Sequence, residues 1–276
     1  MRLLFLLMVI ILSCSCFDTY AQGELLIFPK RIVFKDNETK NVINLINSGE
    51  ETTTYSVSFT QRRMEKDGGF TRISVPEEGQ LFADSYLRIY PRQVTLLPGE
   101  AQSVMIQRRR KSNMQTGEYR SHLYFRSERD NSDISIKRKD SSNTLSIELI
   151  PIIGITIPII FRSGEVSAIA ALSDLKIEKL QGEDPRILFI LNRKGNSSLY
   201  GDLTIEYYPV KGASIIIAKK RGVAIYTTIE KRNMSIKINR LAEINLNEGI
   251  LKIKYTSPPG DGRQIIFTET ELMLTN

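Results

Sequence analysis

Apolar and polar residues alternate along most of this 276-residue chain. The alternation is clear in residues 53–61 (TTYSVSFTQ) and 119–127 (YRSHLYFRS), and similar runs recur at intervals of roughly ten residues. Successive side chains of a β-strand point to opposite faces of a sheet, so each run predicts a strand with one buried face. Turn-forming residues separate the runs, and no stretch shows a convincing helical period. The pattern predicts an all-β fold of antiparallel sandwiches.

One stretch, residues 144–162 (TLSIELIPIIGITIPIIFR), is longer and more apolar than the others. Its odd positions form one apolar row: Leu145, Ile147, Leu149, Ile153, Ile155, Ile157, Ile159 and Phe161. Pro151 and Pro158 lack the N–H that a central strand needs, which predicts an edge strand. An exposed apolar edge favours a binding partner, or self-association of the empty protein. The other interpretation is that the stretch is simply the last strand of a sandwich and runs into a linker.

The length of the chain is enough for two ordinary domains. A polar, charged loop over residues 127–143 precedes the long strand, and Ser163 and Gly164 follow it. We therefore expect one sandwich over residues 22–162 and a second over residues 163–276.

Residues 1–21 have the anatomy of a secretory signal peptide, with one basic residue, an apolar run from Leu3 to Leu12 and small residues before Ala21. Cleavage after Ala21 leaves a mature chain without cysteine, which excludes disulfides and thiol chemistry. Lipoprotein processing at Cys14 is the alternative. The export signal predicts a protein outside the cytoplasm.

The composition offers little for catalysis. The one histidine, His122, has no neighbouring cysteine or acid pair, so we expect it to be an ordinary strand residue facing solvent or the sheet surface. No nucleophile, phosphate-loop or metal motif is present, and the sequence predicts no enzyme activity, no cofactor and no metal site. The net charge of +7 comes from clusters at residues 108–111, 137–139 and 219–221. Without interleaved aromatic residues, we expect these clusters to be solvated loops and strand edges and not a nucleic-acid surface.

Several stretches, taken in order, resemble one family. They are residues 28–34 (FPKRIVF), 42–49 (VINLINSG), 89–104 (IYPRQVTLLPGEAQSV), 117–123 (GEYRSHL) and the isoleucine-rich strand that ends at Arg162. Their order and spacing are similar to those of the periplasmic pilus-assembly chaperones, the PapD-like family, and most of all to its divergent spore-coat-protein-like branch. The likeness covers most of residues 25–162. The C-terminal half is similar only in length and β character.

This resemblance implies two immunoglobulin-like domains arranged as an L, and an ATP-independent chaperone of the periplasm. Such a chaperone lends the apolar row of its last N-terminal-domain strand to an incomplete pilin-like subunit during assembly of a fimbria or pilus, and delivers it to an outer-membrane usher. The client-binding row here is then Leu145, Ile147, Leu149, Ile153 and Ile155.

A cationic pair in the cleft of the family binds the client's C-terminal carboxylate. Arg31 stands at the position of the first cation. Pro158 stands where the second, a lysine, is expected, so Arg120 and Arg162 are the candidate replacements.

Two other functions are compatible with the sequence. A structural or adhesive immunoglobulin-like surface protein, anchored as a lipoprotein, would use the apolar strand only as core. A carbohydrate-binding module would need exposed aromatic residues in a groove.

Overall fold

The computed structural model describes residues 25–35, 37–109, 114–128, 154–179, 182–238, 246–260 and 263–274. Within these ranges the chain consists of β-strands and connecting turns, with one short 3-10 element, η1 (Asp84–Tyr86). None of the described segments forms a helix long and apolar enough to cross a membrane. The predicted signal peptide and most of the predicted client-binding row lie outside the described residues.

The strands up to Ser163 build one sandwich. They are β1 (Leu25–Phe28), β2 (Ile32–Val33), β3 (Lys40–Asn47), β4 (Thr53–Met64), β5 (Phe70–Ile73), β6 (Leu87–Tyr90), β7 (Gln93–Leu96), β8 (Ala101–Arg108), β9 (Gly117–Glu128) and β10 (Gly154–Ser163). One sheet has the order β1-β3-β8-β6 and the other the order β2-β10-β9-β4-β5, with β7 also paired to β4. Alternate side chains of the two sheets meet in an apolar core around Leu45, Ile106, Leu123 and Ile159.

The strands from Ala168 onward build the second sandwich. They are β11 (Ala168–Glu178), β12 (Arg186–Gly195), β13 (Leu199–Tyr208), β14 (Ile215–Ile225), β15 (Lys231–Lys237), β16 (Gly249–Thr256) and β17 (Ile266–Leu274). A three-stranded sheet, β11-β12-β15, packs on a four-stranded sheet, β14-β13-β16-β17. Its core includes Phe189, Leu191, Ile205, Ile253 and Tyr255.

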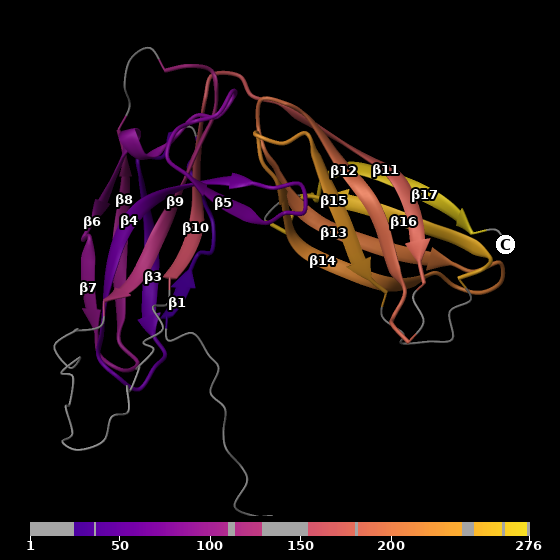
Figure 1. The fold of residues 1–276 in the computed structure, drawn as a ribbon, viewed down its shortest axis with the longest axis horizontal. Helices are drawn as coiled ribbons and strands as arrows, with labels where there is room; N and C mark the ends of the chain where they lie inside the picture. Colours follow the sequence, from indigo (N-terminus) through magenta and orange to yellow (C-terminus); the bar gives the residue numbers. More distant parts are fainter. Residues whose placement is uncertain are drawn as a thin grey trace, which may run out of the picture.

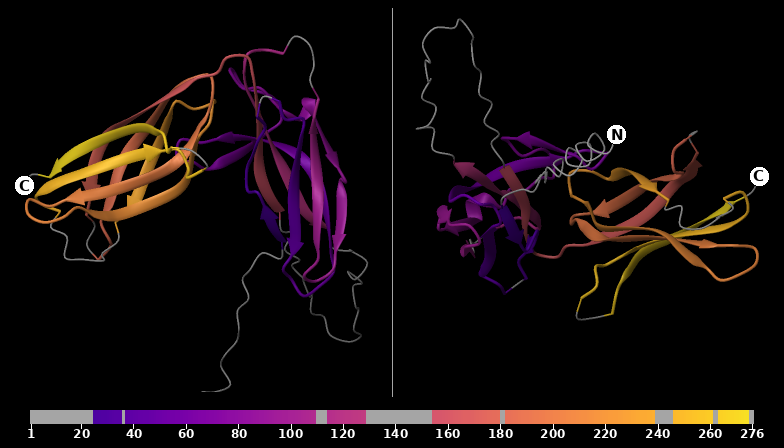
Figure 2. Two further views of the ribbon diagram at one scale, coloured as in Figure 1. Left: turned by 180° about the vertical axis from the view of Figure 1, so that it is seen from behind. Right: turned by 90° about the horizontal axis from the view of Figure 1, so that it is seen from below.

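The predicted fold class, two immunoglobulin-like β-sandwich domains, is confirmed. Figure 1 shows them arranged as an L, with the strands of the first sandwich upright and those of the second running across. The other two views show the same separation into two bodies (Figure 2).

The two sandwiches are in contact through apolar packing and through a hairpin. Met64 and Ile160 of the first pack against Ala224 and Tyr226 of the second in a small buried cluster. The hairpin between β4 and β5 reaches across to the second sandwich (Figure 1), where the Asn233 N–H donates to the Lys66 carbonyl at 2.6 Å. Met64, Ala224 and Tyr226 also line the pocket described next.

The structure corrects one expectation about charge. Arg108 is not solvated but buried, with its guanidinium 4.6 Å from the centre of the Phe161 ring. A guanidinium can bury its planar face against an aromatic ring while keeping its charge, so a basic run in the sequence does not by itself mean exposure. Lys219, Lys220 and Arg221 are exposed on the edge strand β14, as expected.

Candidate functional site

The first component of the site is an unpaired strand edge. β10 pairs with β9 along its whole length, from Gly154 to Ser163, but in the described part of the chain it pairs with β2 only at Ile159 and Ile160. Residues 154–158 therefore have one open side among the described residues. The sequence predicted an edge strand here from its prolines, and the pairing agrees with it.

The backbone shows why Pro158 is tolerated at this edge. The Phe34 N–H donates to the Ile160 carbonyl at 2.9 Å, so the backbone groups of Ile160 point away from β9. Backbone groups alternate sides along a strand, and those of Pro158, Thr156 and Gly154 must point to the same open side. The N–H that Pro158 lacks thus belongs to the open edge, and its absence costs no bond to β9.

The open edge runs beside a pocket of about 260 Å³ between the two sandwiches, which we call the interdomain pocket. Thr156 and Pro158 line it from β10, Arg31 from the segment before β2, and Phe70 and His122 from β5 and β9. The second sandwich contributes Tyr200, Ala224, Tyr226 and Arg232. The described residues that line this pocket include three cationic side chains, Lys30, Arg31 and Arg232, and no carboxylate. Such a lining favours an anion.

Arg31 and Arg120, two of the three predicted anchors, are brought together at this pocket. The Arg31 Nη1 donates to the Tyr226 hydroxyl at 2.8 Å, and its guanidinium lies over the rings of Tyr200 and Tyr226 at 4.5 and 5.4 Å. The Arg120 guanidinium lies 4.2 Å from the centre of the same Tyr226 ring. Arg31 lines the pocket directly, whereas Arg120 is buried beside the ring.

Arg120 is a buried cation without a hydrogen-bond acceptor. It is 3% exposed, and none of its three side-chain nitrogens has a partner among the described residues. Burial lowers the pKa of Arg120, and the charge of Arg31 acts in the same direction. An anion binds more tightly beside a desolvated guanidinium whose donors are unused, because it replaces the lost hydration of the cation.

His122 lies on β9 next to Arg120 in the same row. Burial, followed by the charges of Arg120, Arg62 and Arg31, lowers the pKa of His122 to about 3. The ring makes an edge contact with Phe70, at 5.4 Å between centres. The expectation that this histidine faces solvent or the sheet surface is wrong, because His122 is buried in the interface. Its ring stays neutral at physiological pH.

Arg162, the third predicted anchor, is placed elsewhere. Its Nη2 lies 3.1 Å from Oε2 of the buried Glu118, and the same oxygen accepts hydrogen bonds from the backbone and the hydroxyl of Ser198. Arg162 is thus committed to a contact that joins the two sandwiches. This ion pair leaves Arg162 poorly placed to bind a ligand's carboxylate at the interdomain pocket.

Of the predicted client-binding row, Leu145, Ile147, Leu149 and Ile153 lie outside the described residues. Ile155 is half-buried and packs against the core of the first sandwich. Ile157, Ile159 and Phe161, on the same parity, are fully part of that core. The apolar row is therefore core in its later part, and the role of its earlier part stays a prediction.

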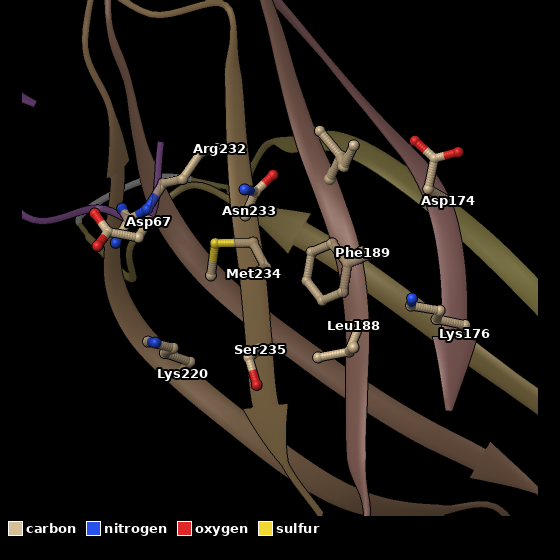
Figure 3. A pocket seen from close by; sticks show the side chains of 11 residues that line it. Asp67, Asp174, Lys176, Leu188, Phe189, Lys220, Arg232, Asn233, Met234 and Ser235 are labelled. Atoms are coloured by element: carbon tan, nitrogen blue, oxygen red, sulfur yellow. The ribbon is translucent and has the colours of Figure 1, made fainter. Parts of the chain in front are cut away.

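A larger pocket of about 480 Å³ lies in the second sandwich (Figure 3). Phe189 and Met234, which belong to the apolar core, form its floor, and lysines and acids are mixed at its margin. Figure 3 shows Asp67 of the β4–β5 hairpin beside Arg232, which lines both pockets. This pocket lacks the concentration of one charge that distinguishes the interdomain pocket. The described residues also contain no group of three histidine, cysteine or acidic residues placed to hold a metal ion.

Comparison with known proteins gives similarity at the level of solved structures. No protein-family model and no curated protein matches the chain. The YadV chaperone is 10% identical with a TM-score of 0.47, and the match covers 91% of this chain and all of that one. The chaperone and tip adhesin of CFA/I fimbriae give 15% identity and a TM-score of 0.44 over 88% of this chain and 97% of that one.

A third match is the CsuC–CsuE chaperone–tip subunit complex of Acinetobacter baumannii, with 12% identity and a TM-score of 0.43 over 90% of this chain and 98% of that one. The chain resembles the fimbrial chaperones. Identities this low and TM-scores below 0.5 do not assign a function, which has to come from the site itself.

Proposed function

We propose that this protein binds a partner polypeptide by adding a strand of the partner to the open edge of β10 and holding the partner's C-terminal carboxylate at Arg31, beside Arg120. The observation that carries the proposal is that the open edge leads directly into a pocket with clustered cations and no acid. An extended peptide supplies both groups that these two features need, a row of backbone hydrogen-bond partners and a terminal negative charge.

The edge selects for an extended chain. Gly154 and Thr156 each offer an N–H and a carbonyl on the open side, and Pro158 offers only a carbonyl. Four residues of an added strand cover this length, about 13 Å. The loss of one donor at Pro158 falls beside the pocket, where a charge-assisted contact to Arg31 compensates for it.

The biological setting follows from the sequence resemblance. We infer an ATP-independent periplasmic chaperone that caps pilin-like subunits by strand donation and passes them to an outer-membrane usher. Within this proposal Leu145, Ile147, Leu149 and Ile153 extend the open edge toward the N-terminus of β10 and fill the apolar groove of the client, and pairing of two such edges is the expected form of self-association. Folding of the client on the strand supplies the free energy, so no nucleotide site is needed.

The experiment compares the full-length protein with a Leu149→Asp plus Ile153→Asp double variant. Each is expressed with an affinity tag in a host that carries its natural clients, and the proteins that co-purify from the periplasm are identified by mass spectrometry. We expect the double variant to keep its circular dichroism spectrum and unfolding midpoint but to lose the captured subunit, because charges in the row cannot enter an apolar groove.

A Val210→Asp variant is the matched control, since Val210 is exposed on the second sandwich, away from the edge. Capture by the double variant at the level of this control would contradict strand donation. Loss of the fold in the double variant would mean that the row is core, and would favour the surface-protein alternative.

A further inference from the structure

Tyr226 is the residue of the second sandwich that contacts both arginines of the proposed carboxylate site. It follows β14 and is buried, at 3% exposure, in the small apolar cluster with Met64 and Ile160 of the first sandwich. Its hydroxyl accepts the hydrogen bond from Arg31, and its ring lies beside the guanidinium groups of Arg31 and Arg120. A residue 195 positions from Arg31 thus fixes the geometry of the pair.

The chemical nature of the groups that hold Arg31 matters as much as their position. Among the described residues, Arg31 makes no ion pair, and its contacts are a phenol oxygen and two aromatic faces. A carboxylate in that place would hold Arg31 equally well but would neutralise it and compete with a ligand's carboxylate. An aromatic ring attracts the cation through its quadrupole and leaves the full charge available to a ligand.

The Tyr226 hydroxyl can also donate a hydrogen bond. It accepts a hydrogen bond from Arg31, and no described residue accepts the hydrogen of Tyr226 itself. Tyr226 lines the interdomain pocket, so that hydrogen is free to be donated to an anion bound there. The phenol therefore serves the site both as an acceptor for Arg31 and as a donor toward the ligand.

We infer that Tyr226 is a positioning residue of the carboxylate site, and that the site is complete only while the two sandwiches are docked. The inference rests on the proposed function, because it assumes that a carboxylate binds at Arg31. Its consequence is coupling: a partner's C-terminus stabilises the docked arrangement, and undocking releases the partner by removing the group that holds Arg31. The second sandwich thus has a direct part in retention of the partner.

The test measures the preference of the whole protein for a free carboxylate over an amide. The probe is the short peptide acetyl-threonyl-valyl-threonyl-valine, made with a free C-terminus and as the C-terminal amide, with affinities measured by NMR titration. The wild type is expected to favour the free acid by about tenfold, the usual effect of one charge-assisted hydrogen bond. The Tyr226→Phe variant keeps the ring and removes the hydroxyl, and its preference is expected to fall to about threefold.

Tyr207→Phe is the matched control. It removes a phenol hydroxyl that donates a hydrogen bond to the Glu248 carbonyl in the second sandwich, away from the pocket. The positioning role requires that Tyr226→Phe weakens binding of the acid peptide more than binding of the amide peptide, while its unfolding midpoint stays at that of the Tyr207→Phe variant. The same preference in Tyr226→Phe and wild type overturns the inference, and so does an equal loss of both peptides, which is the signature of a purely structural residue. If the wild type binds acid and amide equally, the carboxylate anchor of the proposed function is itself wrong.

Discussion

Glu118 and Arg120 lie two positions apart on β9, both almost fully buried and both turned toward the second sandwich, yet their surroundings are opposite. One oxygen of Glu118 accepts hydrogen bonds from Arg162 and from two groups of Ser198. The three nitrogens of Arg120 have no acceptor in the described part of the chain.

Under the proposed function, the difference is that between a structural charge and a charge whose acceptor is the ligand. A buried charge is tolerated when hydrogen bonds and an opposite charge replace its hydration. Glu118 meets that condition at Oε2, which joins the two sandwiches, while its Oε1 is buried without a hydrogen-bond partner among the described residues. Arg120 does not meet it, and aromatic contact with Tyr226 offsets only part of the loss. An anion in the adjacent pocket would lower the remaining cost.

The largest expected effect on stability comes from removing Glu118. Glu118→Ala leaves Arg162 and Ser198 without their shared acceptor, so we expect the free energy of unfolding to fall by about 3 kcal/mol. Urea unfolding at neutral pH measures it. Glu183→Ala is the control, because its pair with Arg186 is exposed and is worth about 0.5 kcal/mol or less. Equal costs for the two variants would mean that Glu118 is not a structural charge.

His122 provides the next test, since it follows Arg120 in the same row and is held neutral. With a pKa of about 3 in the folded protein and about 6.5 when unfolded, it takes up a proton on unfolding between these values. Its contribution to stability is therefore complete above pH 6.5 and is lost as pH falls toward 3. We expect the titration of His122 to lower the free energy of unfolding by roughly 2 kcal/mol between about pH 7.5 and pH 5.

The measurement is the difference in unfolding free energy between these two pH values, in wild type and in a His122→Phe variant. Because His122 is the one histidine of the chain, the variant removes every histidine titration. Its pH dependence in this range should be shallower than that of the wild type by the stated amount. Parallel pH curves would show that His122 is hydrated and titrates normally.

The smallest expected change in stability has the opposite sign. Arg120→Met replaces an unsatisfied buried cation by an apolar chain of similar length, so we expect the free energy of unfolding to rise by about 1 kcal/mol. The same variant should lower the preference for a free-acid peptide over its amide, because the positive charge beside the pocket is lost while Arg31 stays. A marked loss of stability would instead place Arg120 with Glu118, as a structural charge.

The sequence by itself determined the elements that depend on local pattern. Alternation with a period of two specified the strands, because each strand buries one face, and it identified both sandwiches without any contact being known. Pro158 predicted the open edge, because a missing N–H is incompatible with pairing on that side. The anchor role of Arg31 stays a prediction from the resemblance of residues 28–34 to one family. The client-binding row stays a prediction, and Ile155, the one member that the structure describes, packs against the core.

Only the tertiary structure decided which of the predicted anchors lie together at the interdomain pocket. Arg31, Arg120 and Arg162 look alike in the sequence, but Glu118 and Ser198 hold Arg162, while Tyr226 brings the other two together. The groups that contact each arginine depend on which distant segments pack against each other. The local alternation of apolar and polar residues carries no information about that packing. Tyr226 itself carried no signal in the sequence, because an aromatic residue next to a strand is ordinary until its neighbours across the domain interface are known.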